Sequence, residues 1–183
     1  MPLRFKVCHM RNHQGFTLIE LMVTIAVAAV VMAIAVPSMQ LMQANARMAS
    51  AANDLASDLK KARSDAIAYR TNYTFLANGG SWGGGWQSTF NVIDNAAATA
   101  VPESKTLLHK VALPANVTIA QATTTFLFNG TTGRVSDAAG VSVDITFVVC
   151  DSKVSGESGY NVDLNRFGRV LIQRHTSSTT CSI

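Results

Sequence analysis

The chain has 183 residues, which allows one ordinary domain with an appendage but leaves too little for two full domains. Its net charge is +4, from 15 lysines and arginines against 11 aspartates and glutamates, yet only 14% of its residues are charged. Soluble globular chains usually carry about 25% charged residues, so the composition indicates one segment that is built for a medium other than water.

The first 15 residues form a basic leader that accounts for most of the charge excess. Arg4, Lys6 and Arg11 lie there without any acidic residue. Subtracting these three from the 15 basic residues leaves 12 against the same 11 acids, so the remaining chain has a net charge of about +1. The excess is therefore a routing signal, and a nucleic-acid interaction cannot be inferred from the total charge.

The leader is followed by an apolar segment over residues 16–46, with no charged residue from Leu21 to Ala46. The 21 residues from Phe16 to Val36 would span about 31 Å as a helix, close to the hydrocarbon thickness of a bilayer. Because basic flanks stay on the cytoplasmic side, we expect a single membrane span with residues 47 onward outside the cytoplasm.

Two simpler interpretations of this segment are a secretory signal peptide and a plain N-terminal anchor. The small residues of Ala33-Ile34-Ala35 would suit signal cleavage. Neither interpretation explains Glu20, a lone carboxylate near one end of the apolar run. An ionisable group costs a few kcal/mol there and usually has a function, so Glu20 needs a partner.

The stretch Gly15-Phe16-Thr17-Leu18-Ile19-Glu20-Leu21 closely resembles the processing site of type IV pilins and type II secretion pseudopilins. The resemblance implies that a prepilin peptidase cuts between Gly15 and Phe16, and that the new amino group of Phe16 is methylated. It also implies that Glu20 pairs with the terminal amine of a neighbouring subunit, which in an apolar bundle would favour the correct neighbour. The implied partners are other major or minor pilins or pseudopilins, the inner-membrane assembly platform, and inner-membrane lipid before assembly.

Beyond the membrane segment the pattern predicts that the helix continues over residues 47–70. Pro37 is expected to kink or locally break it. Seven apolar residues recur at helical spacing and predict one buried stripe: Met48, Ala52, Leu55, Leu59, Ala62, Ala66 and Tyr69. We expect this half to pack on its own domain rather than to form a free coiled coil.

The pattern of residues 71–183 predicts a β-rich head domain. The candidate strands are 73–77, 86–93, 107–111, 117–120, 124–128, 141–150, 160–164 and 169–175. The clearest alternates apolar and polar residues from Val141 to Cys150, and Asn129-Gly130 suits a tight hairpin. A long helix against such strands predicts an α+β fold with an antiparallel sheet, which is the pilin fold that the resemblance implies.

A glycine-rich stretch at residues 79–86 looks at first like a phosphate-binding loop. It lacks the Gly-Lys-Ser/Thr ending that would place a lysine and a hydroxyl on the phosphates. We therefore predict a hairpin connection in which Trp82 and Trp86 pack back onto the sheet, with an exposed partner contact as the alternative.

The cysteines predict one disulfide once the leader, with Cys8, is removed. Cys150 and Cys181 are then an even pair in an oxidising compartment. Closing the loop of about 32 residues would contribute about 3 to 4 kcal/mol by the chain-entropy estimate. Two free thiols are the alternative.

Catalytic and metal-binding patterns are not found in the sequence. After the leader only His109 and His175 remain, in no catalytic or ligand spacing, and the acidic residues are scattered singly. We expect neither an enzyme nor a cofactor nor a metal site.

The C-terminal half resembles the GspH/FimT group of minor pilins and pseudopilins. The resemblance rests on 149–152, on 165–170 and on the helix segment 55–66. It implies a low-abundance subunit of the bacterial inner membrane, with a periplasmic head, that helps to initiate or cap a filament. The filament would be a surface pilus or, alternatively, the periplasmic pseudopilus of a type II secretion system.

Some FimT-like members bind DNA through a Gly-Arg-x-Arg pattern near the C-terminus. The matching stretch here is Gly168-Arg169-Val170-Leu171, in which the second arginine is replaced. The candidate DNA-binding residues are Arg166, Arg169, Arg174 and His175, and the competing interpretation is solvated or structurally paired arginines. DNA is thus a partner to be tested rather than one that the motif establishes.

Overall fold

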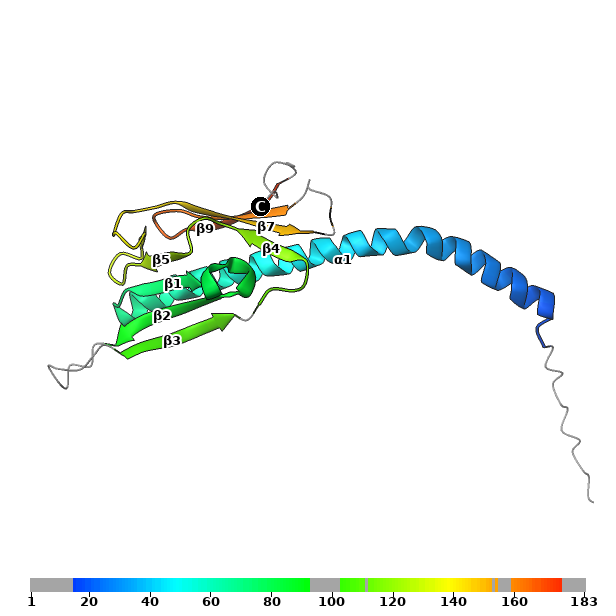
Figure 1. Cartoon of the computed structure of the whole chain (residues 1–183), viewed down its shortest axis with the longest axis horizontal. Helices are drawn as coiled ribbons and strands as arrows, with labels where there is room; N and C mark the ends of the chain where they lie inside the picture. Colours follow the sequence, from blue (N-terminus) through cyan, green and yellow to red (C-terminus); the bar gives the residue numbers. More distant parts are fainter. Residues whose placement is uncertain (1–14, 93–102, 111, 153, 155–158, 176–183) are drawn as a thin grey trace, which may run out of the picture. The chain divides into compact units, whose positions relative to one another are not determined.

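The structure is a computed structural model that describes residues 15–92, 103–110, 112–152, 154 and 159–175. It divides into two compact units, Met1–Gln40 and Leu41–Ile183, which are described separately. A single helix, α1 (Leu18–Tyr69), contributes to both (Figure 1). Its bounds agree with the helix predicted over residues 16–70 to within two residues at each end.

Pro37 lies inside α1, and the chain is helical on both sides of it. The local break that the sequence predicted there is therefore wrong, whereas the kink stays a prediction. Proline at this position removes one backbone N–H donor from the hydrogen bonds of the helix. The remaining hydrogen bonds of a 52-residue helix keep the chain helical.

The C-terminal half of α1 carries the predicted apolar stripe. Six of the seven predicted stripe residues are buried, from Met48 to Ala66. Tyr69 is the exception, because it is 66% exposed and stacks on Phe90 instead. The prediction that this half packs on its own domain is confirmed.

The helix ends in a Schellman motif built without glycine. Arg70 takes the left-handed conformation, with φ of 49°. Its N–H donates to the Ile67 carbonyl over 3.3 Å, and the Thr71 N–H donates to the Ala66 carbonyl over 3.1 Å. This cap fixes the direction in which the chain enters the first strand.

Within the part of the chain that the structure describes, nine strands follow the helix and form two antiparallel sheets (Figure 1). The strands are β1 (Tyr73–Ala77), β2 (Trp86–Val92), β3 (Glu103–Lys110), β4 (Val117–Ala120), β5 (Thr125–Phe128), β6 (Val135–Ser136), β7 (Ile145–Asp151), β8 (Gly159–Leu164) and β9 (Val170–His175). The first sheet has the order β3-β2-β1-β5-β6 and the second the order β4-β7-β8-β9. The α+β class and the antiparallel sheet that the sequence predicted are confirmed.

The strand bounds are closest to prediction where local alternation decides them. β1 and β4 have the predicted bounds, and β2, β3, β5, β8 and β9 differ at described positions by at most four residues. The strand predicted from Val141 starts only at Ile145, because Val141 is 60% exposed and lies in a turn around Asp137. The sequence did not predict the two-residue strand β6. The tight hairpin predicted at Asn129-Gly130 is wrong, because the connection between β5 and β6 runs over six residues and its positive φ lies at Gly133.

The core joins the apolar stripe of α1 to aromatic side chains of both sheets. Trp82 and Trp86 are 2% and 0% exposed, so the predicted packing of the glycine-rich connection is confirmed. The Trp82 ring meets Phe147 edge-on at 4.9 Å, and its Nε1 donates to the Thr123 carbonyl over 3.1 Å. Such contacts satisfy the indole donor and add to the stabilisation from buried area.

Among the described residues, three polar side-chain pairs connect α1 to strands of the two sheets. Asp58 accepts a hydrogen bond from Trp86 Nε1 over 2.8 Å, and Asp54 pairs with Lys110 over 2.8 Å. Arg47 donates through Nη2 to the fully buried carboxylate of Asp151 over 2.9 Å. A buried charge of this kind needs such a partner, since an unpaired one would be strongly destabilising.

Candidate functional sites

The N-terminal candidate site combines a capped helix end with an exposed apolar surface. The Thr17 hydroxyl accepts a hydrogen bond from the Glu20 N–H over 3.3 Å, which makes Thr17 the N-cap of α1. Glu20 occupies the third helical position, and an acidic group there is favoured by the helix dipole. The carboxylate of Glu20 has no hydrogen-bond or ion-pair partner within the described residues.

The exposed surface of α1 from Leu18 to Met42 is mostly apolar, and Glu20 is its one charged residue. Residues 15–43 are all exposed, and Phe16 is 82% exposed. In the described part of the chain α1 alone is long and apolar enough to cross a membrane. A surface of this size on a single helix is stable only in lipid or against other apolar helices.

The C-terminal arginines are placed differently from one another. Arg166 lies in the turn between β8 and β9 and binds Asp144 through two guanidinium nitrogens, with Nη2 donating over 2.6 Å and Nε over 3.2 Å. Its backbone N–H also donates to Asp144, over 2.7 Å. Arg166 is therefore the structurally paired arginine that the sequence left as the competing interpretation.

The pairing predicts a pH dependence. Hydrogen bonds from the Arg166 guanidinium, and then from its backbone N–H, hold the pKa of the Asp144 carboxyl below its usual value. Because the pKa of Asp144 is lower in the folded state, the pair stabilises the turn fully at pH values above the unfolded-state pKa of about 3.9. This stabilisation is lost as the pH falls through the folded-state pKa. We expect the Tm difference between wild type and Asp144→Asn to be constant from pH 5 to 7 and to shrink below pH 4, as measured by thermal unfolding. A difference that persists unchanged to pH 2 would contradict this assignment.

The structure places Arg169 and Arg174, two of the four predicted DNA-binding residues, at opposite ends of β9. Arg169 precedes β9 and Arg174 lies near its far end, so they are about 17 Å apart along an extended strand. Arg174 shares the strand face of Val170 and Ile172, whereas Leu171 lies on the other face. The side chain of His175 lies outside the described residues.

A different arginine, which the sequence motif does not include, contacts the loop that carries Arg169. Arg134, at the end of the β5–β6 loop, places its guanidinium carbon 5.2 Å from the centroid of the Phe167 ring. Phe167 is 55% exposed, and Arg134 and Arg169 are exposed as well. We call Arg134, Phe167 and Arg169 the Arg–Phe surface; it combines cations with an aromatic ring, as single-strand nucleic-acid sites do.

The signal for Arg134 was a repeated dipeptide. Gly133-Arg134 and Gly168-Arg169 each place an arginine after a glycine with positive φ, 64° and 78°. The two loops are in contact, because the Val135 N–H donates to the Arg166 carbonyl over 3.0 Å. The dipeptide was visible in the sequence, but its pairing across the two loops depends on the fold.

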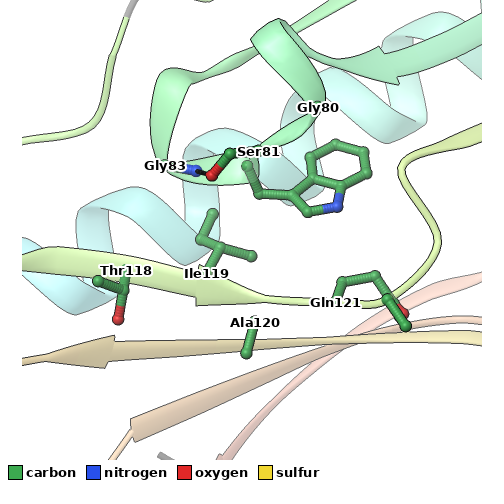
Figure 2. A pocket seen from close by; sticks show the side chains of 9 residues that line it. Gly80, Ser81, Gly83, Thr118, Ile119, Ala120 and Gln121 are labelled. Atoms are coloured by element: carbon green, nitrogen blue, oxygen red, sulfur yellow. Dashed lines mark hydrogen bonds between the residues drawn. The ribbon is translucent and has the colours of Figure 1, made fainter. Parts of the chain in front are cut away.

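The glycine-rich connection contributes one wall of a cavity of about 470 Å³. Figure 2 shows the loop of Gly80, Ser81 and Gly83 facing the end of β4, and the nine lining residues are all uncharged. Within the described residues no group of three or more His, Cys, Asp or Glu side chains could hold a metal ion. The cavity thus offers no titratable group for chemistry.

Comparison with known proteins identifies two segments. The family described as type II transport protein GspH matches residues 51–168, and the prokaryotic N-terminal methylation motif matches residues 10–36. No curated protein matches the chain significantly.

Solved structures of one protein resemble the fold. The type IV minor pilin FimU of Pseudomonas aeruginosa, in space group P21, is 21% identical with a TM-score of 0.51, covering 69% of this chain and 87% of FimU. A second crystal form, P65, is 20% identical with a TM-score of 0.48 and covers 68% and 90%. The P21 structure supports the pilin fold for the described head.

Proposed function

The chain belongs to the GspH family of minor pilins and pseudopilins, and on that premise we propose that it is a minor pilin that initiates, caps or assembles a type IV pilus. The observation that carries the proposal is the combination of an N-terminal methylation motif over residues 10–36 with a GspH head over 51–168. The exposed apolar half of α1 supports insertion in the inner membrane and then in a filament core.

The same proposal assigns the route of assembly. The peptidase cuts after Gly15, Phe16 is methylated, and the basic leader keeps that end in the cytoplasm while the head folds in the periplasm. The Glu20 carboxylate, which has no partner within the described residues, pairs with the amine of a neighbouring subunit. The assembly platform then extracts the subunit from inner-membrane lipid.

The alternative function is that of a minor pseudopilin of a type II secretion system, which the description of the matching family supports. A deletion strain separates the two. Loss of surface pili and twitching, restored by the gene, supports the pilus, whereas loss of exoprotein release with normal pili supports the pseudopilus and overturns our choice.

The disulfide between Cys150 and Cys181 belongs to the proposal as well. Cys150 is buried in β7, and Cys181 lies outside the described residues. A non-reducing mass measurement that found both thiols free would rule the bond out.

Nucleic-acid binding by the Arg–Phe surface is a second candidate function, which the Arg134–Phe167 contact favours. We expect the double variant Arg134→Ala, Arg169→Ala to bind a labelled single-stranded oligonucleotide about tenfold or more weakly than wild type. The slope of log affinity against log salt concentration should become shallower by about 1.4, since each lost phosphate contact lowers its magnitude by about 0.7 for single strands. Fluorescence anisotropy of the full chain in detergent measures both.

Arg174→Ala is the matched control, because it removes an exposed arginine at the other end of β9. It should leave the affinity within about twofold of wild type, since one remote charge is largely screened at physiological salt. Equal losses in the control and in the double variant would sink the assignment to the Arg–Phe surface.

A further inference from the structure

Arg63 of α1 reaches both loops that carry the Arg–Phe surface. Its Nε donates to the Gly133 carbonyl over 3.1 Å, and the side chain is half-buried. The contact spans 70 residues of sequence and ties the helix to the β5–β6 loop.

The Arg63 side chain fills the space beside two glycines, so neither glycine could carry a Cβ without a close contact. A Cβ on Gly133 would lie 3.0 Å from Arg63 Nε and 2.7 Å from Ile67 Cδ1. A Cβ on Gly168 would lie 2.5 Å from Arg63 Cδ and 2.5 Å from the Gly133 carbonyl oxygen. Both glycines have positive φ, which L side chains rarely adopt, so the two turns beside Arg63 need glycine for conformation as well as for space.

Each of these glycines is followed directly by an arginine of the Arg–Phe surface. Arg134 follows Gly133, and Arg169 follows Gly168, with Phe167 on its other side. The Arg63 stem therefore packs against both loops, beside the Val135–Arg166 hydrogen bond that joins them.

We propose that Arg63 is a positioning residue that holds the two loops in register, so that Arg134, Phe167 and Arg169 form one nucleic-acid-binding surface. The proposal rests on the second candidate function above. It differs from a direct role, in which the charge of Arg63 would itself contact a phosphate. The two roles depend on different atoms of the same side chain.

A pair of substitutions separates the roles. In Arg63→Gln the side-chain amide nitrogen takes the place of Nε, so the donor to Gly133 and the stem are kept while the charge is lost. In Arg63→Lys the charge is kept, but a methylene replaces Nε. Positioning predicts that R63Q binds the oligonucleotide within about threefold of wild type, because only a screened charge is lost. It predicts a loss of about tenfold or more for R63K, the size of effect that one lost hydrogen bond to a charged group gives.

The measurements use the full chain in detergent, with anisotropy for binding and limited trypsin digestion for the loops. Cleavage after Arg134 and Arg169, relative to cleavage after Arg174, should be faster in R63K and unchanged in R63Q. If R63K binds at least as well as R63Q, or if the digestion rates of the two variants agree, the positioning role is overturned. If the wild type binds no nucleic acid, the second candidate function fails and the proposal with it; the digestion alone would then show whether Arg63 still fixes the loops.

Discussion

Replacing Glu20 with alanine is expected to remove the chain from filaments while leaving its leader cleaved and the helix inserted in the membrane. In the proposed filament the carboxylate meets the amine of a neighbouring Phe16 among apolar helices. Removing one partner of a buried ion pair costs about 3–5 kcal/mol, because the other charge stays buried and unpaired. Incorporation should therefore fall by about a hundredfold or more, since each 1.4 kcal/mol is a factor of ten.

Immunoblots of sheared filaments and of the membrane fraction measure this result. Thr24→Ala is the matched control, because Thr24 lies one turn further along the same exposed helix and its hydroxyl bonds only to the Leu21 carbonyl. Gly15→Leu should fail earlier, with the leader still attached. Wild-type incorporation of the Glu20 variant would refute the pairing, and complete cleavage of the Gly15 variant would refute the processing site.

The fold was predictable where short-range patterns decide it. Strand alternation gave the bounds of β1 and β4, and helical spacing gave the buried stripe from Met48 to Ala66. Val141 continues the alternation of β7 but stays exposed, because the Asp137 carboxylate accepts the Val141 N–H over 2.9 Å and holds the chain in a turn. Two residues such as β6 carry no periodicity at all, so pairing with β5 alone defines them.

The two candidate sites also differ in whether short-range sequence patterns reveal them. The N-terminal site is contiguous, so its residues from Gly15 to Glu20 are visible as one motif. The Arg–Phe surface joins Arg134 to residues more than 30 positions later, and Arg63 lies 70 positions before its acceptor. Arg166, one of the four candidate DNA-binding residues, is paired with Asp144, a partner 22 residues away. Long-range pairing of this kind cannot be read from a single sequence.

Gly130→Ala is expected to lower the free energy of unfolding of the head by about 2–3 kcal/mol, the upper range for inserting atoms into a packed site. A Cβ there would overlap the Thr71 nitrogen and lie 2.6 Å from the carbonyl carbons of Arg70 and Thr71. Those atoms are backbone, and they belong to the Schellman cap that ends α1. The Gly130 N–H is also held, because it donates to the Asn72 side chain over 2.9 Å. Neither partner can move without opening the junction between helix and sheet.

Gly83→Ala is the control that isolates this steric effect. Gly83 has no positive φ, and its added Cβ would meet only Ser81 Oγ at 3.6 Å, an ordinary contact. Its substitution should change the free energy of unfolding by less than about 1 kcal/mol, since it adds neither overlap nor left-handed strain. Thermal and urea unfolding of both variants compare the two costs directly. If Gly130→Ala were no less stable than Gly83→Ala, the β5–β6 loop would have room to move away from the helix cap, and the close approach at Thr71 would not be what demands glycine.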